Sequence, residues 1–229
     1  MSIDMDRIQA LCFDVDGTLS DTDDKWTHSL DRILQPLKPF IPVGDVKHLA
    51  RWLIMGFESP GNWVYGVLDR IGLDDEAAKF FSTLSHIRRD SADNSFWLVP
   101  GVSQMLALLG NRYPMAVVSA RGEGSTLSFL KQYNLQRHFD VIVTGQTCIR
   151  SKPFPDPILF AASRMGVSPQ QCLMIGDTTV DIRAGRAAGA QTVGVLCGFG
   201  NEIELLRAGA DLILPSPAEL AGLLIPDDT

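Results

Sequence analysis

The chain has 229 residues, of which 45% are hydrophobic and 21% are charged, so it can bury a sizeable core like an ordinary globular protein. Its formal net charge of -7 argues against a nucleic-acid-binding protein, because such proteins normally carry a basic patch. No apolar run is long enough to span a bilayer, and the first residues lack the apolar core of a signal peptide. The four cysteines are widely spaced and indicate neither a zinc site nor a disulfide framework. We therefore expect a cytoplasmic protein that binds neither nucleic acid nor membranes.

The first predicted element is a buried strand that ends in two aspartates. The largely apolar run from Ile8 to Phe13 is typical of a parallel strand buried on both faces, and Asp14 and Asp16 follow it. Side chains two residues apart on a strand point the same way, so both carboxylates can face one pocket. Two carboxylates that close repel each other unless a cation or a shared proton lies between them. An acidic turn with both side chains in water is the simpler alternative at this point.

A long helical stretch follows, from residue 21 to residue 97. Its apolar residues recur at helical spacing, and breaks at prolines and glycines divide it into about four helices. All four tryptophans lie in this stretch or at its exit, which favours a packed helical bundle over an aromatic ligand site. Because the stretch interrupts the chain directly after the first strand, we expect a cap domain at 21–97 above Asp14 and Asp16. The core domain then comprises residues 1–20 and 98–229.

From residue 98 onward, helical and strand patterns alternate. The strands are predicted at 114–119, 140–144, 171–176, 190–196 and 211–214, and the helices at 102–109, 123–133, 155–165, 178–188, 202–207 and 217–224. Strands that alternate with helices are typical of a doubly wound, mostly parallel, Rossmann-like α/β sheet. Ligands of such sheets bind at the carboxyl ends of the strands. We therefore expect the functional residues at that edge.

Two of the later strand ends carry groups that suit a negatively charged ligand. Ser119 ends the second strand of the core, where its hydroxyl can donate to a phosphate oxygen, although a serine at a strand end is common. Lys152 lies in the loop after the third strand, where Pro153 and Pro155 limit the directions in which its amine can point. A fixed ammonium group beside carboxylates would stabilise charge that develops on a transferring group.

The end of the fourth strand completes an acidic set. Asp177 follows a glycine at the strand end, and Asp181 lies one helical turn later on the same side. Acidic residues at a helix amino terminus are often only caps, but these two join Asp14 and Asp16 at one sheet edge. Four converging carboxylates need a cation, and Mg²⁺ suits them because it prefers oxygen ligands and keeps waters that phosphate can replace. The sequence therefore predicts a Mg²⁺ site formed by these four aspartates.

Four segments resemble the motifs of the haloacid dehalogenase-like hydrolase superfamily. They are Asp14-Val-Asp-Gly-Thr-Leu, Ser119, Lys152-Pro-Phe-Pro and Gly176-Asp-Thr-Thr-Val-Asp181, and they occur in the order of the family. The insertion after the first motif resembles the family's helical cap of the first type. The segments Lys-Pro-x-Pro-Asp-Pro, Ala-Gly-Arg-Ala-Ala-Gly189 and Ala-Gly-Ala-Asp211 resemble the phosphoglycolate phosphatase branch. One difference is Ala120-Arg121, where many phosphoglycolate phosphatases have Asn-Lys.

The resemblance implies a role for each acidic residue. Asp14 would be the nucleophile that forms an aspartyl-phosphate, and Asp16 would be the general acid and then the general base. Mg²⁺ would be held by Asp14, Asp177 and the backbone carbonyl of Asp16, and Asp181 would support it directly or through water. The implied enzyme is a Mg²⁺-dependent phosphatase, a phosphoric monoester hydrolase. Its substrates would be small phosphorylated metabolites of the phosphoglycolate or sugar phosphate type.

The resemblance also implies how the substrate is held. Ser119 and Lys152 would bind the transferring oxygens, and the cap would close to exclude water and to select the leaving group. Arg51, Arg88 and Arg89 are candidates in the cap for contact with substrate, although surface arginines are the simpler interpretation of them.

Three other functions are compatible with this fold, two of them enzymatic and one not. A phosphoglucomutase-like enzyme would transfer the phosphoryl group to a second sugar hydroxyl instead of to water. A 2-haloacid dehalogenase needs neither a metal nor a second aspartate, so Asp16, Asp177 and Asp181 count against it. A non-enzymatic, partner-binding relative could lose the nucleophile or the metal ligands, and none of them is missing here.

Overall fold

The computed structural model describes residues 3–21 and 97–225, so the predicted helical cap and its Arg51, Arg88 and Arg89 lie outside the described residues. Within them, six parallel strands form one sheet in the order β5-β4-β1-β6-β7-β8. The strands are β1 (Ala10–Phe13), β4 (Met115–Val118), β5 (Val141–Val143), β6 (Cys172–Gly176), β7 (Gln191–Val195) and β8 (Leu212–Leu214). The predicted doubly wound, Rossmann-like sheet is therefore confirmed.

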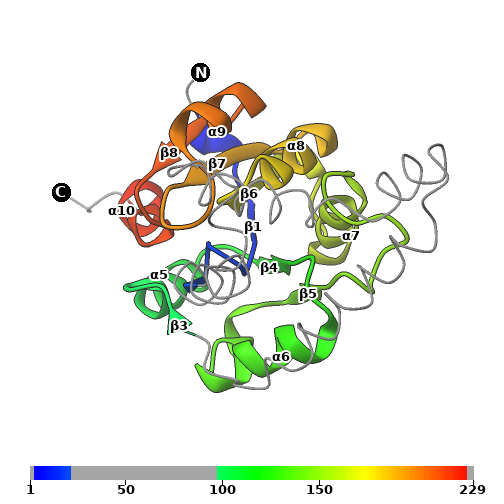
Figure 1. Ribbon diagram of the computed structural model, residues 1–229, viewed down its shortest axis with the longest axis vertical. Helices are drawn as coiled ribbons and strands as arrows, with labels where there is room; N and C mark the ends of the chain where they lie inside the picture. Colours follow the sequence, from blue (N-terminus) through cyan, green and yellow to red (C-terminus); the bar gives the residue numbers. More distant parts are fainter. Residues whose placement is uncertain (1–2, 22–96, 226–229) are drawn as a thin grey trace, which may run out of the picture.

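Helices connect these strands and cover both faces of the sheet. The α-helices are α5 (Val102–Leu109), α6 (Glu123–Gln132), α7 (Asp156–Met165), α8 (Thr179–Ala188), α9 (Glu202–Ala208) and α10 (Leu220–Leu224). Short 3₁₀ turns occur at η1 (Met5–Arg7), η3 (Gln136–His138), η4 (Pro169–Gln171) and η5 (Pro217–Glu219). Figure 1 shows α5 and α10 on one side of the sheet and α7 and α8 on the other.

The two faces of the sheet are packed with side chains of different size. On the side of α5 and α10, large residues such as Phe13, Leu106 and Met115 fill the space between helix and strand. On the side of α7 and α8, small residues such as Ala161 and Ala184 dominate the buried contacts. Every residue of β1 is buried, as expected for a strand covered on both faces. This packing fixes the strand whose end carries the first two aspartates.

The strand order places the reversal of the winding direction at β1. The chain runs from β1 outward to β4 and β5, and then returns to the other side of β1 to form β6. Phe13 lies opposite Val117 of β4 and Ile175 of β6, so the three strands reach the carboxyl edge together. Open parallel sheets bind ligands where the winding direction reverses in this way. The residues that follow β1, β4 and β6 therefore meet at one place.

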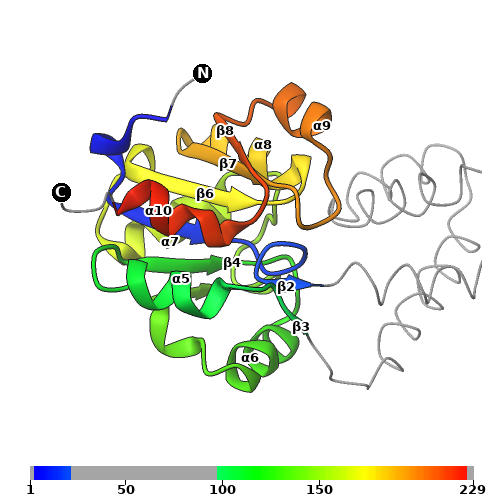
Figure 2. The same ribbon diagram turned by 90° about the vertical axis from the view of Figure 1, so that its left-hand side faces the viewer.

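A two-stranded antiparallel ribbon lies beyond this edge. It consists of β2 (Ser20–Asp21) and β3 (Trp97–Leu98), with Ser20 opposite Leu98 and Asp21 opposite Trp97. In Figure 2 the ribbon lies next to the carboxyl ends of the central strands. The ribbon joins the two points at which the long insertion leaves and re-enters the core, while the domain boundaries at 20/21 and 97/98 stay a prediction.

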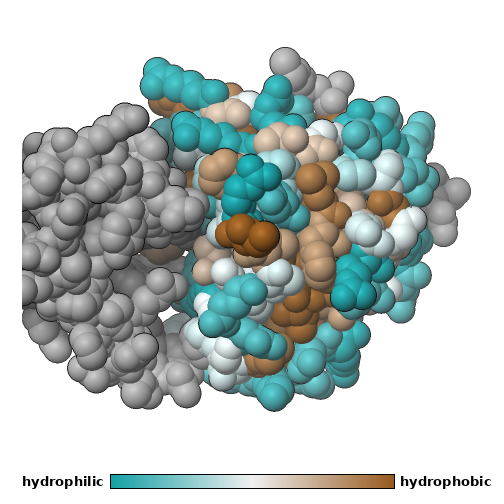
Figure 3. Space-filling view, turned by 90° about the vertical axis from the view of Figure 1, so that its right-hand side faces the viewer, coloured by the Kyte–Doolittle hydropathy of each residue, from teal (hydrophilic) through white to brown (hydrophobic). Residues whose placement is uncertain are grey.

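The outer surface is mostly polar, with apolar side chains at a few places. Figure 3, which faces the side of the molecule with α7 and α8, shows brown apolar patches among hydrophilic side chains. Exposed apolar residues near the start of α7 include Ile149 and Phe154, and the Arg150 guanidinium lies 5.1 Å from the centre of the Phe154 ring. Among the described helices, none combines the length and the apolar character that crossing a membrane requires.

Candidate active site

Asp14 stands at the end of the central strand, where its backbone N–H donates to the carbonyl of Ile175 at 2.9 Å. Its carboxyl group is buried, and burial raises its pKa from 3.8 to about 7 because the charged form loses its water. The positive charge of Lys152 opposes this shift, whereas the negative charges of Asp181 and Asp16 add to it. A buried carboxyl group with a pKa near neutrality is typical of functional sites.

Lys152 is the cation that faces Asp14. Its Nζ donates to Asp14 Oδ1 at 2.6 Å and to Asp181 Oδ1 at 2.5 Å, and only 3% of the residue is exposed. In the same loop Ile149 is 102% exposed and Phe154 is 39% exposed. The loop thus buries its charged residue and exposes apolar ones, the reverse of the usual distribution. The two carboxylates that Lys152 bridges explain why its charged group is buried.

Asp177 and Asp181 are each oriented by groups close to them in the fold. Asp181 Oδ2 accepts hydrogen bonds from the backbone N–H of Thr178 at 3.1 Å and from its hydroxyl at 2.7 Å. This is the capping box of α8, so the interpretation of Asp181 as a helix cap is confirmed. Asp177 Oδ1 accepts from the Thr18 hydroxyl at 3.4 Å, and its Oδ2 accepts from the backbone N–H of Phe199 at 2.8 Å.

The carboxylates fit a divalent cation. Asp14, Asp177 and Asp181 are all buried, and each offers an oxygen that lies within 4.8 Å of the others. Oxygen donors at this separation suit Mg²⁺-like hard cations. When ionised, the four aspartates carry four negative charges, and Lys152 and Arg121 neutralise two of them. The two negative charges that stay uncompensated match the charge of one divalent cation. The Asp16 side chain is not part of this trio.

Asp16 is instead held by Arg121, which follows β4. Arg121 Nε donates to Asp16 Oδ2 at 2.5 Å, and Nη2 donates to Asp16 Oδ1. Ser119, also buried, accepts the Arg121 backbone N–H on its Oγ at 3.1 Å, and its hydroxyl hydrogen can still be donated to a ligand. The sequence singles out Arg121 only as a difference from related enzymes. The pairing with Asp16 is new information from the structure.

The loop after β7 is a further part of the site that the sequence motifs do not include. Besides the Phe199 contact, Gly200 N–H donates to the backbone carbonyl of Asp177 at 3.0 Å. A Cβ atom on Gly198 would lie 2.2 Å from Asp177 Oδ2 and 2.5 Å from the carbonyl oxygen of Gly17. Only glycine therefore fits between Asp177 and the turn that follows Asp16. Gly198 and Gly200, shortly after the buried strand β7, are the signal that could have indicated this loop.

We expect Gly198→Ala to weaken divalent-cation binding, because the new methyl group must displace the Asp177 carboxylate. Loss of a contact that orients a metal ligand typically lowers metal affinity by about 10- to 100-fold. Isothermal titration calorimetry of the metal-free protein with Mg²⁺ measures this affinity. Gly124→Ala is the matched control, since a Cβ atom there meets no other atom within 4 Å. Equal cation affinity in Gly198→Ala and wild type would contradict the role of this loop.

A parallel α/β sheet with buried carboxylates and one bridging lysine at its carboxyl edge defines an enzyme that uses carboxylate chemistry. The model of the haloacid dehalogenase-like hydrolase family matches residues 11–195. The chain therefore belongs to the haloacid dehalogenase-like hydrolase family.

Several relatives cover nearly the whole chain. The chain is 28% identical to a phosphoglycolate phosphatase from Nitrosococcus oceani, over 94% of this chain and 96% of that protein. It is 27% identical to pyrophosphatase PpaX from Bacillus pumilus, over 96% and 98% of the two chains. The crystal structure of a hydrolase of this family from Deinococcus radiodurans, with bound phosphate and sodium, is 26% identical and has a TM-score of 0.71, covering 96% of this chain and 99% of that one.

Proposed function

We propose that this protein is a Mg²⁺-dependent phosphatase that hydrolyses small phosphorylated metabolites through an aspartyl-phosphate on Asp14. The observation that carries this proposal is the buried Lys152 ammonium between Asp14 and Asp181, next to three carboxylates that can share one cation. Such a site offers a nucleophile and a concentrated positive charge for phosphoryl oxygens. The names of the relatives from Nitrosococcus and Bacillus, and the phosphate bound by the Deinococcus hydrolase, support it.

In the first half of the proposed reaction, a carboxylate oxygen of Asp14 attacks phosphorus. Lys152 already contacts Oδ1, so we assign the attack to Oδ2. The bond between phosphorus and the leaving oxygen breaks, and Asp16 gives that oxygen a proton. Ser119 and Lys152 bind the transferring oxygens. Mg²⁺, when held by Asp14, Asp177 and the backbone carbonyl of Asp16 with support from Asp181, supplies charge that neutralises the phosphoryl group.

In the second half, water releases the phosphoryl group from Asp14. Asp16 takes a proton from the water, whose oxygen attacks phosphorus as the bond to Asp14 breaks. Inorganic phosphate leaves and the Asp14 carboxylate is restored. A mutase would place a sugar hydroxyl where this water stands, so the two activities differ in the acceptor and share the residues of the core. A dehalogenase would need neither a metal nor Asp16 as a proton donor, so the carboxylates of Asp16, Asp177 and Asp181 count against it.

A screen over phosphorylated two- to six-carbon metabolites and an aryl phosphate tests this function. We expect release of inorganic phosphate in the presence of Mg²⁺. The rate should fall about 100-fold or more in a chelator, because the metal stabilises the charge of the transition state by several kcal/mol. Interconversion of hexose phosphates without net phosphate would indicate the mutase instead. Chloride release from a 2-haloacid in chelator would indicate the dehalogenase, and no turnover of any ester would refute a phosphatase.

A further inference from the structure

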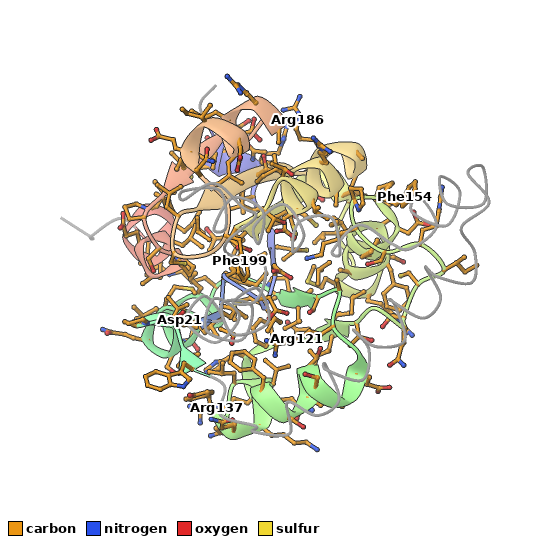
Figure 4. All side chains as sticks on the ribbon, viewed as in Figure 1. Asp21, Arg121, Arg137, Phe154, Arg186 and Phe199 are labelled. Atoms are coloured by element: carbon orange, nitrogen blue, oxygen red, sulfur yellow. The ribbon has the colours of Figure 1, made fainter. Side chains whose placement is uncertain are left out.

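The ion pair between Arg121 and Asp16 joins two strand ends through a planar fork. Both nitrogens, Nε and Nη2, donate to Asp16, and each contacts a different carboxylate oxygen. Arg121 is 8% exposed, and Figure 4 places it toward the middle of the molecule, in contrast to Arg186 at the edge. A two-point contact between flat groups fixes orientation as well as distance. The pair therefore fixes the direction in which the Asp16 carboxylate points.

The backbone of Arg121 is also fixed at both of its polar groups. Its N–H donates to Ser119 Oγ at 3.1 Å, and its carbonyl accepts from the N–H of Gly145 at 2.8 Å. A Cβ atom on Gly145 would lie 2.5 Å from the carbonyl oxygen of Ala120, so only glycine lets the two segments approach this closely. The arginine is thus part of a built arrangement, anchored to β4 and to the loop after β5.

Lys152 and Arg121 contact different carboxylates of the site. Lys152 is shared by Asp14 and Asp181. Arg121 contacts Asp16 through two of its nitrogens. Asp16 therefore has a cationic partner separate from the lysine.

We infer that Arg121 is a positioning residue that holds the Asp16 carboxylate in the direction from which it exchanges protons with the leaving group and with water. Arg121 acts through Asp16 and does not bind the phosphoryl group or the leaving group. The inference rests on the proposed phosphatase function. It assigns a task to the residue at which this chain differs from many phosphoglycolate phosphatases.

Steady-state kinetics of Arg121→Met and Arg121→Lys test this role with two substrates, an aryl phosphate and a phosphate ester that carries a carboxylate. We expect kcat to fall about 100-fold for both substrates in Arg121→Met, with KM nearly unchanged, because misplacing a reacting group costs about that factor. Arg121→Lys should recover only part of kcat, since lysine restores the charge without the fork. Added guanidinium at non-denaturing concentration should partly restore kcat of Arg121→Ala.

Two kinetic outcomes would overturn the inference. A rise in KM for the carboxylate-bearing ester alone, with kcat preserved, would show that Arg121 binds the substrate. Kinetics equal to wild type in Arg121→Met would show that the arginine has no role in the reaction. Arg186→Met is the control, because Arg186 is also near an aspartate, Asp211, but lies on the surface away from the site.

A double-mutant cycle in chelator tests the pair without any turnover. Arg121→Met, Asp16→Asn and the double variant are unfolded thermally, and the three Tm changes are compared. We expect the Tm of Arg121→Met to fall further than the Tm of the double variant, because the single change leaves a carboxylate without its partner. Additive changes would refute the pair and with it the inference. Absence of phosphatase activity in wild type would refute the proposed function, so the two failures are distinct.

Discussion

Asp14→Asn is expected to abolish phosphate release while the protein remains folded. Asparagine cannot form the aspartyl-phosphate, and the loss of a catalytic nucleophile lowers kcat by about 10⁴-fold or more. The amide carbonyl of the new side chain can still accept the hydrogen bond that Lys152 Nζ gives to Asp14 Oδ1 at 2.6 Å, so the local structure has a substitute contact. Phosphate release and mass spectrometry for a phosphoryl adduct measure the effect.

The same substitution should raise stability when no metal is bound. Burial raises the pKa of Asp14 from 3.8 to about 7, so the folded state prefers the protonated carboxyl group. The stability that this preference contributes is fully present below pH 3.8 and is lost as the pH rises through about 7. Wild type therefore carries a cost at about pH 8 of at most roughly 4 kcal/mol, which the neutral asparagine avoids. In chelator, Asp14→Asn should melt at a higher temperature than wild type at about pH 8, and the difference should shrink toward about pH 5.

The phosphate release and the Tm of Asp14→Asn test two separate statements, the role of Asp14 as nucleophile and the cost of burying its charge. Wild-type turnover in Asp14→Asn would remove Asp14 as the nucleophile and would leave another residue to be found. A lower Tm than wild type at about pH 8 in chelator would mean that the Asp14 charge is well compensated, in contradiction to the effect of its burial.

Lys152→Met should have the second large effect, on both stability and activity. The change leaves Asp14 and Asp181 without the ammonium group that contacts both of them in the interior. Breaking a buried ion pair by removing one partner costs about 3–5 kcal/mol, which corresponds to a fall in Tm of roughly 6–20 °C for a chain of this size. The kcat should fall at least about 100-fold, because the proposed function uses this charge to stabilise the transferring oxygens.

Metal and a control variant make this prediction specific. Because Lys152→Met leaves more negative charge near Asp14, added Mg²⁺ should raise its Tm more than it raises the Tm of wild type. Lys131→Met is the matched control, since Lys131 lies on the exposed side of α6. A Tm change in Lys152→Met as small as in Lys131→Met would show that the buried bridge does not contribute to folding.

The sequence predicted the sheet well because its strands are short apolar runs that end in polar residues. The predicted strand at 171–176 corresponds to Cys172–Gly176, and the predicted helix at 102–109 corresponds to Val102–Leu109. Differences occur where local patterns are weak. The stretch 217–224 begins as a 3₁₀ turn before α10, and the two-residue strands β2 and β3 are too short to show any periodicity.

The site was only partly predictable, for two physical reasons. Side chains at strand ends follow from the order of the sheet, so Asp14, Lys152 and Asp181 could be expected near one another. The partner of Asp16 is Arg121, 105 residues away, and no local pattern specifies a contact at that separation. The orientation of Asp177 by Phe199 uses a backbone N–H, which every residue except proline has, so side-chain motifs do not show it.

The ribbon formed by β2 and β3 has a consequence for how such a protein can change. Because Ser20 pairs with Leu98, the two ends of the core chain lie side by side at the point of interruption. The entropy of closing a loop grows only slowly with its length, so segments of very different size can be accommodated there. Recombination could therefore exchange the segment between Asp21 and Trp97 while the carboxylates and their lysine are inherited as a unit.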